Sequence, residues 1–240
     1  MLRIPMTTPP EPVTMAERLF VQLRQAIVEG EIPANSKLSE QDLARRHGVS
    51  RGPLREALRR LAASDLVELR PNVGARVVAL TAQRLLELYP VREALEGTAA
   101  RLAAQAMSAT ALAELRELVE MHQRQLSIEG GAYFQQEGDL DFHFRIIQGS
   151  GNTRLVRLLC DDLYHSVRMY RYQFGMASPR AKPAYTEHLL IVDALEARDG
   201  EQAEMLMRSH VRASRRNVER QLSRRGEIGA GPLPPREGEK

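Results

Sequence analysis

Residues 48–61 read GVSRGPLREALRRL and have the pattern of a helix that follows a tight turn. Gly48 ends a preceding helix, and Ser50 can cap the next one after a single intervening residue. Pro53 is tolerated in the first helical turn, because the backbone donors there have no intrahelical partner. The apolar residues that follow recur at helical spacing and predict a buried face; they are Leu54, Ala57, Leu58 and Leu61.

Two more helices are predicted upstream of this segment. The first begins at Thr14, which together with Glu17 has the spacing of a capping box, and it ends at Gly30. The second is shorter, is capped by Ser39 and ends at Gly48. Two helices joined by a tight glycine-containing turn, with a third helix behind them, make a helix-turn-helix.

The apolar period changes downstream of the third helix. Residues 66–69 and 75–78 have the pattern of two short strands that flank a turn at 70–74, and we expect this hairpin to be a wing. Pro90 should kink the first helix of the following region or split it in two. From Thr81 onward the spacing is again that of long helices, expected at about 81–106, 109–129, 132–150, 153–174, 184–198 and 200–223.

These elements predict a mainly α fold: an N-terminal winged helix-turn-helix with a small β-hairpin wing, followed by a C-terminal all-α helical bundle. The 240-residue chain is long enough for two domains, which we place at 13–80 and 81–225. Residues 1–12 are rich in Pro and Thr and residues 226–240 in Gly and Pro, so both are expected to be disordered tails. The net charge of +3 is too small to indicate nucleic-acid binding by itself.

Several features bear on the compartment. Cys160 is the single cysteine, which excludes an intrachain disulfide and favours a reducing setting; we interpret it as a small buried hydrophobe. No stretch approaches the ~18 apolar residues that a membrane span requires. Residues 1–12 lack the basic and apolar regions of a secretion signal. We therefore expect a cytoplasmic protein without membrane contact.

Positive charge is concentrated on the helix that follows Ser50. Between Arg45 and Arg60 there are six arginines and one acid, Glu56. An α-helix fits the major groove of DNA, where an arginine can read guanine or clamp phosphate. The alternative is a solvated charged face, but the tight turn, the wing and the deficit of acids together favour double-stranded DNA as the partner. Three of the arginines stack along one side of the helix, opposite its leucines: Arg51, Arg55 and Arg59.

The stretches 30–33, 38–44 and 48–61 resemble the DNA-binding domain of the GntR family of bacterial regulators, and the resemblance extends over about 14–78. Two positions depart from the family pattern and bear on base preference: members often carry Arg or Glu at Gln41 and Thr at Gly52. The resemblance implies DNA contacts by Gln41, Ser50, Arg51, Gly52 and Arg55, with Asn72 and Gly74 at the wing tip.

The second domain contains candidate metal ligands. Asp139 and His143 are four residues apart, so on a helix a carboxylate and an imidazole would lie on one face. His188 and His210 add two imidazoles, and such a set suits Zn, Ni, Mn or Fe with one or two positions open. The alternative is that these histidines are hydrogen-bonded residues inside a helical bundle.

Residues 88–96, together with Asp139-x-x-x-His143, 150–152, 187–188 and His210, resemble the FadR-type C-terminal domain called FCD, over about 84–215. The resemblance implies a divalent metal held by Asp139, His143, His188 and His210, with a carboxylate effector beside it. Arg92 matches a family arginine that faces this pocket; its alternative is a salt bridge to Glu96. Pro90 departs from the family pattern. We interpret His47, His122 and His165 as surface or structural residues.

The favoured function is a metabolite-responsive transcription regulator, not an enzyme. It would bind a palindromic operator as a homodimer and change its DNA affinity when a small organic acid binds near the metal. One alternative is a metal-dependent hydrolase or lyase fused to a DNA-binding module, but no obvious Glu is placed as a general base beside the metal pair. Another is an architectural DNA binder that senses nothing.

Overall fold

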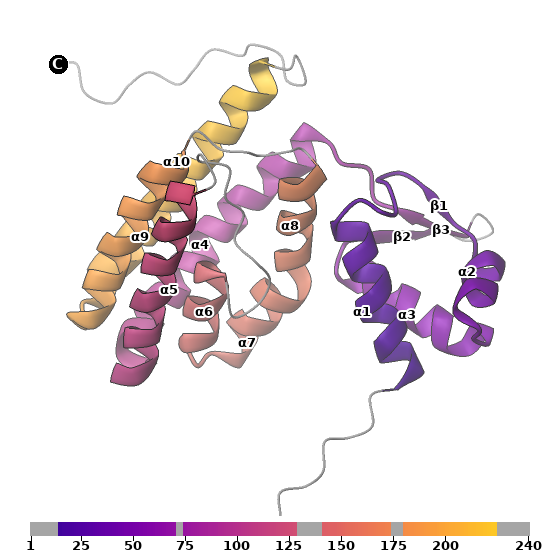
Figure 1. Cartoon of the computed structure of the whole chain (residues 1–240), viewed down its shortest axis with the longest axis horizontal. Helices are drawn as coiled ribbons and strands as arrows, with labels where there is room; N and C mark the ends of the chain where they lie inside the picture. Colours follow the sequence, from indigo (N-terminus) through magenta and orange to yellow (C-terminus); the bar gives the residue numbers. More distant parts are fainter. Residues whose placement is uncertain (1–13, 71–73, 129–140, 174–179, 225–240) are drawn as a thin grey trace, which may run out of the picture. The chain divides into compact units, whose positions relative to one another are not determined.

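The computed structural model describes residues 14–70, 74–128, 141–173 and 180–224 (Figure 1). The chain divides into two compact units, Met1–Ala79 and Leu80–Lys240, which are described separately below. No helix in the described part of the chain is long and apolar enough to cross a membrane.

The first unit is a three-helix cluster with a small antiparallel sheet in the strand order β1-β3-β2. The expected hairpin is formed by β2 and β3, with Val67 opposite Val77 and Arg70 opposite Gly74. β1 pairs with the other edge of β3 and was not expected, because its two residues are too few to show a period. The elements are α1 (Met15–Val28), β1 (Lys37–Leu38), α2 (Glu40–His47), α3 (Arg51–Ala63), β2 (Val67–Arg70) and β3 (Gly74–Val77).

The ends and the buried face of these helices follow the local sequence signals. The Thr14 hydroxyl accepts a hydrogen bond from the backbone N–H of Glu17 at 3.1 Å, so one half of the expected capping box is present. The Glu17 carboxylate instead accepts from Arg60 of α3 and joins two helices that are distant in sequence. The predicted inner face of α3 is confirmed, with Leu54, Ala57, Leu58 and Leu61 at most 1% exposed.

The second unit is entirely helical. α10 runs along α4, and Figure 1 shows these two long helices side by side. Small residues of α4 suit this close approach, because Ala100, Ala103 and Ala104 are fully buried in the cluster that also contains Ala203 and Met207 of α10. The elements are α4 (Ala82–Ala106), α5 (Ala109–Ile128), α6 (Phe142–Gly149), α7 (Thr153–Val156), the π-helix η2 (Arg157–Leu163), α8 (Tyr164–Gln173), α9 (Ala181–Glu196) and α10 (Gly200–Arg224).

The structure refines three expectations about the helices of this unit. Pro90 does not split α4, which is continuous over 25 residues. The helix expected at 132–150 is described only from Phe142, where the Asp141 carboxylate caps it by accepting from the N–H groups of His143 and Phe144 at 2.9 and 3.2 Å. The helix expected at 153–174 contains the wider turns of η2, a feature that apolar spacing does not reveal.

The core of the second unit contains Cys160. Its side chain is 3% exposed and packs in an apolar cluster that includes Ile147, Leu155 and Leu159. Burial raises the pKa of the Cys160 thiol to about 12, so the group stays protonated at neutral pH. The interpretation of Cys160 as a small buried hydrophobe is confirmed.

Candidate DNA interface and candidate metal centre

The turn between α2 and α3 is built by glycine. Gly48 has φ 64° and ψ 35°, a left-handed conformation that suits glycine and lets α3 start three residues after the C-cap of α2. Ser50 occupies the N-cap of α3 but makes no side-chain capping bond with a described residue. Its hydroxyl is therefore exposed at the start of the basic helix, beside Arg51.

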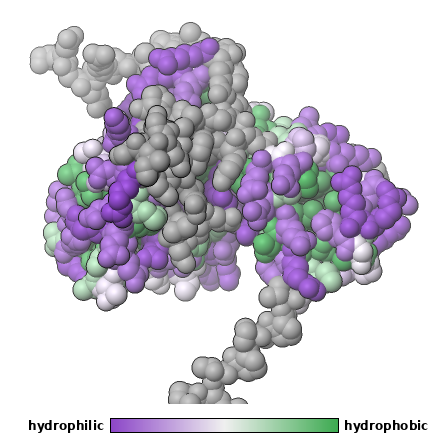
Figure 2. Space-filling model, in the orientation of Figure 1, coloured by the Kyte–Doolittle hydropathy of each residue, from purple (hydrophilic) through white to green (hydrophobic). Residues whose placement is uncertain are grey.

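The residues predicted to contact DNA lie on the exposed side of α2 and α3. Arg55 is exposed, and its Nε donates to the Glu40 carboxylate at 2.9 Å, which holds the guanidinium against the start of α2. Gly74 is exposed at the start of β3, whereas Asn72 lies outside the described residues. Figure 2 shows that the edge of this unit formed by α2 is hydrophilic. Gln41, Ser50, Arg51 and Gly52 are exposed as well.

The arginines of this region divide into two groups. Arg60 turns inward: it pairs with Glu17, and its guanidinium carbon lies 4.1 Å from the centroid of the Phe20 ring. It therefore stabilises the helix packing and does not belong to the outward charge. Arg51 and Arg59 form no ion pair with any described residue and are exposed. Because positive charge on an exposed helix attracts phosphate, these side chains suit a DNA-facing surface.

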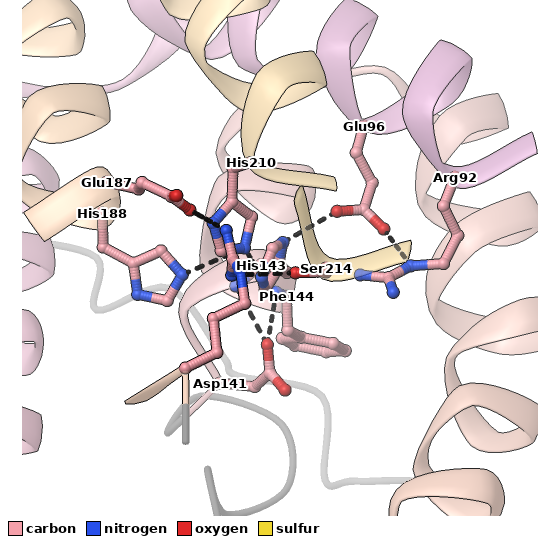
Figure 3. A network of polar contacts seen from close by, with 10 residues as sticks. Arg92, Glu96, Asp141, His143, Phe144, Glu187, His188, His210 and Ser214 are labelled. Carbon is pink, nitrogen blue, oxygen red and sulfur yellow. Dashed lines mark hydrogen bonds and ion pairs between the residues drawn. The ribbon is translucent and has the colours of Figure 1, made fainter. Parts of the chain in front are cut away.

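Three histidines meet inside the second unit. They are His143 at the start of α6, His188 on α9 and His210 on α10. Each is 4–6% exposed. The Nε2 atom of His210 lies 3.2 Å from Nε2 of His143 and 3.3 Å from Nε2 of His188, and Figure 3 shows the three rings converging. We call this set the histidine cluster.

Two carboxylates fix the orientation of two of these rings. Glu96 Oε2 lies 2.7 Å from Nδ1 of His143, and Glu187 Oε2 lies 2.7 Å from Nδ1 of His210. An ionised carboxylate only accepts hydrogen bonds, so each Nδ1 carries the proton and the neutral ring presents the Nε2 lone pair to the centre of the cluster. Two such lone pairs 3.2 Å apart repel each other unless a cation or a shared proton lies between them.

The electrostatics of the histidine cluster favour the neutral form of His188 and His210. Burial and then the neighbouring His210 and His143 lower the pKa of His188 well below its usual value. Burial and then His143 lower the pKa of His210 in the same way. Burial alone would raise the pKa of Glu96, but Arg92 and His143 hold it below its usual value, so this carboxylate is ionised. Neutral imidazole is the form that binds a metal ion.

The spacing of the histidine cluster fits one metal ion. Nitrogen ligands at 2.0–2.1 Å from a tetrahedral ion are separated from one another by about 3.3 Å. The distances from His210 Nε2 to the Nε2 atoms of His143 and His188, 3.2 and 3.3 Å, agree with that value, and all three ligand atoms lie within 4.8 Å of one another. The residues present therefore fit a divalent metal with imidazole ligands, and two of the rings already have the carboxylate partners that metal-bound histidines use.

The fourth predicted ligand, Asp139, lies outside the described residues. Its proposed pairing with His143 relied on both residues sharing one face of a helix. That geometric argument fails, because α6 begins at Phe142 and Asp141 is an extended N-cap with φ −102° and ψ 122°.

A pocket adjoins the histidine cluster and encloses about 350 Å³, counting the space at its mouth. Arg92 and Glu96 of α4 line it, together with His143. Arg92 donates from Nε to Glu96 Oε1 at 2.6 Å, so the expected alternative, an ion pair with Glu96, is present in addition to the pocket position. No described residue accepts from the terminal nitrogens of Arg92, which leaves these donors for a bound acid.

Several residues of this region were missed by sequence reasoning. Glu96 and Glu187 contact the imidazoles at Nδ1, on the side away from the cluster centre, so neither is placed as a general base there. Arg168 of α8 also lines the pocket and is 6% exposed. The signal for Glu187 was its place next to His188 in the sequence. Glu96 was expected only as a partner of Arg92, and neither its contact with His143 nor the position of Arg168 has a local signal. Of the other histidines, His47 is exposed and His122 and His165 are buried.

Both units match known families. Residues 15–77 match the model described as bacterial regulatory proteins, gntR family, and residues 87–213 match the FCD domain. The chain is 34% identical over 200 residues to the probable D-xylose utilization operon transcriptional repressor of Paenarthrobacter nicotinovorans, covering 83% of this chain and 87% of that protein. It is 32% identical over 208 residues to the HTH-type transcriptional regulator BphR of Paraburkholderia xenovorans, covering 84% of each.

A solved structure agrees with the fold. E. coli McbR/YncC superimposes with a TM-score of 0.66 over 88% of this chain and 99% of that chain, at 21% identity. The family matches and the identities together cover the basic helix of the first unit and the histidine cluster of the second. The chain therefore belongs to the GntR family of bacterial transcriptional regulators, in the FadR-like group with an FCD domain, and is not an enzyme.

Proposed function

We propose that this protein is a metal-containing transcriptional repressor whose affinity for DNA changes when a small organic acid binds beside the histidine cluster. The observation that supports this most strongly is the convergence of three buried imidazoles next to a pocket that presents Arg92. Repression is proposed because a relative of similar domain content is named a transcriptional repressor.

In this proposal, His143, His188 and His210 hold one divalent ion, Zn, Ni, Mn or Fe, with Asp139 as a fourth ligand. When bound, the ion supplies a positive centre with an open position for a carboxylate oxygen. Arg92 donates from its terminal nitrogens to the same carboxylate, while Glu96 holds the guanidinium from the Nε side. The buried setting of Arg92, 5% exposed, strengthens this contact because little water competes for it.

The DNA-binding side of the proposal uses the exposed residues of α2, α3 and the wing. Ser50, Arg51, Gly52 and Arg55 would enter the major groove from the N-terminal end of α3, and Gln41 would contact the backbone or a base edge. Asn72 and Gly74 would reach the adjacent minor groove. We further propose a homodimer on a palindromic operator, with DNA binding in residues 13–80 and effector binding in residues 81–225.

The decisive experiment combines metal content with DNA binding. Untagged protein is analysed for metal per chain, and its binding to DNA selected from genomic fragments is measured with and without small carboxylic acids. About one ion per chain and an acid-dependent change in DNA affinity are expected. By reciprocity, saturating DNA must change the acid affinity by the same factor; equal acid affinities with and without DNA would contradict the proposal.

Two variants separate the roles of the two units. Arg55→Ala should weaken DNA binding and leave the metal content unchanged, because the side chain is exposed on α3. His143→Ala should remove the metal and leave binding to non-selected DNA unchanged. Loss of both properties in either variant would indicate misfolding, which circular dichroism of the same samples checks.

A further inference from the structure

The pocket beside the histidine cluster has two chemically different sides. Arg92, Glu96 and His143 form a polar side. The other side belongs to η2 and α8, which also place Tyr164 and Arg168 in the lining. Residues four apart lie along one flank of this helix. Leu159, Leu163 and Val167 on this flank line the pocket, as does Ile147 of α6. We call these four residues the aliphatic wall.

The polar groups of the pocket are charged or already engaged. Glu96 accepts from both Arg92 and His143, and the Asp141 carboxylate accepts from the two N–H groups at the start of α6. Among the described residues that line the pocket there is no Ser, Thr, Asn or Gln side chain. Tyr164 supplies the one neutral hydroxyl among these described lining residues. A ligand hydroxyl that faced Leu159, Leu163 or Val167 would lose its water without gaining a hydrogen-bond partner from those side chains.

The pocket is also small. Its volume of about 350 Å³ includes solvent space at its mouth, so the enclosed part admits only a compact ligand. One carboxylate at Arg92 and a compact body against the aliphatic wall would occupy it. Burial of each methylene group of such a body is favourable, whereas each unpaired hydroxyl in its place is not.

We propose that the effector is a small carboxylic acid with a hydrocarbon body, aliphatic or aryl, and not a polyhydroxylated sugar acid. This inference rests on the proposed function, because it assumes that the pocket is the effector site. It adds that Leu159, Leu163 and Val167 decide which acid is accepted, and that Arg92 recognises only the carboxylate that all candidate acids share.

Two acids of six carbons test the inference on the metal-loaded wild-type protein by calorimetric titration. 4-Methylpentanoate has a branched hydrocarbon body, and D-gluconate carries hydroxyls along the same chain length. We expect 4-methylpentanoate to bind at least about tenfold more tightly. The alcohol 4-methylpentan-1-ol has the same body without a carboxylate and should bind weakly, which separates recognition of the acid from adsorption to apolar surface.

Two leucine variants of η2 test whether the aliphatic wall causes the preference for 4-methylpentanoate over D-gluconate. Leu163→Asn places an amide in the aliphatic wall and should remove the preference by weakening 4-methylpentanoate about tenfold or more. Leu158→Asn is the matched control, since Leu158 is 46% exposed and does not line the pocket. It should leave both affinities unchanged. Metal content and thermal unfolding of both variants are measured to check that they fold. The comparison of the two acids on the wild-type protein does not depend on either variant.

The outcomes distinguish this inference from the proposed function. Gluconate binding as tightly as 4-methylpentanoate, with loss of that binding in Arg92→Gln, would overturn the hydrocarbon-bodied effector and leave the acid-sensing site in place. Failure of both acids and of other small carboxylates to bind the metal-loaded protein would overturn the proposed function and the inference with it. Equal binding of the alcohol and the acid would overturn both, because the carboxylate would then contribute nothing.

Discussion

Glu96 contacts His143 through one carboxylate oxygen, at 2.7 Å from Nδ1, although the two residues are 47 positions apart in the chain. Its other oxygen accepts from Arg92 Nε at 2.6 Å. A single ionised carboxylate therefore lies between the proposed effector-binding arginine and a proposed metal ligand. A change in the position of Arg92 when an acid binds would alter the hydrogen bonding of His143 directly.

Glu96→Gln should weaken metal binding about 10- to 100-fold, the usual effect of removing the hydrogen-bond partner of a metal-binding histidine. The amide can accept from His143 only by turning its NH2 group toward the guanidinium of Arg92, so two donors would face each other. Competition with a chromophoric chelator measures the affinity. Glu87→Gln, at an exposed position of the same helix, is the control and should bind metal as the wild type does. Equal affinities for both variants would contradict the positioning role of Glu96.

The stability of the metal-free protein should decrease as the pH falls. The pKa values of His188 and His210 are lowered well below 6.5 in the folded state, first by burial, so the unfolded chain binds more protons in this range. Stability is then fully present above the unfolded pKa and is lost as the pH falls through about 6.5. Thermal unfolding of chelator-treated protein between about pH 7.5 and 5.5 measures the slope.

His188→Gln should flatten this dependence, because one buried group that resists protonation is removed. His47→Gln changes an exposed histidine and should leave the slope unchanged. A slope that is the same in all three proteins would show that other groups cause it.

Replacing Arg51 should affect DNA binding, whereas replacing Arg60 should affect stability, although both residues lie on α3. Arg51→Ala should weaken DNA binding by about 1–3 kcal/mol and leave thermal unfolding unchanged, because the side chain is exposed. Arg60→Ala should lower stability by about 1 kcal/mol or less, since the ion pair with Glu17 is half exposed and the contact with Phe20 adds little more. Fluorescence anisotropy and thermal unfolding of the two variants test this. A stability loss in Arg51→Ala would place its side chain inside the fold.

Gly52→Ala should separate stability from DNA binding. A Cβ atom at Gly52 meets no other atom within 4 Å, so the first unit has no packing reason to keep glycine there. Alanine is the better helix former and should stabilise the unit by up to about 1 kcal/mol. DNA affinity should decrease if the backbone approaches DNA closely at this position. Fluorescence anisotropy measures the DNA affinity of Gly52→Ala, and an unchanged affinity would exclude Gly52 from the DNA interface.

Much of the fold was predictable because its signals are local. The N-caps at Thr14 and Ser39 and the left-handed Gly48 act within a few residues, and the apolar spacing of α3 is complete within four turns. Such signals depend on backbone geometry that one short segment determines by itself. The candidate histidines were singled out by the resemblance to the FCD domain, because their spacing in the sequence does not distinguish metal ligands from hydrogen-bonded histidines of a bundle.

The sequence by itself determined the helix-turn-helix, the wing hairpin, the helical second unit and the three histidines at 143, 188 and 210. Only the tertiary structure decided that Glu96 and Glu187 orient two of these rings, that Arg60 turns inward, and that η2 and α8 supply an aliphatic wall. His143 and His210 are 67 residues apart, yet their Nε2 atoms lie 3.2 Å from each other. Helix periodicity repeats every few residues and predicts which face is buried, but the partner that meets this face depends on how separate helices pack.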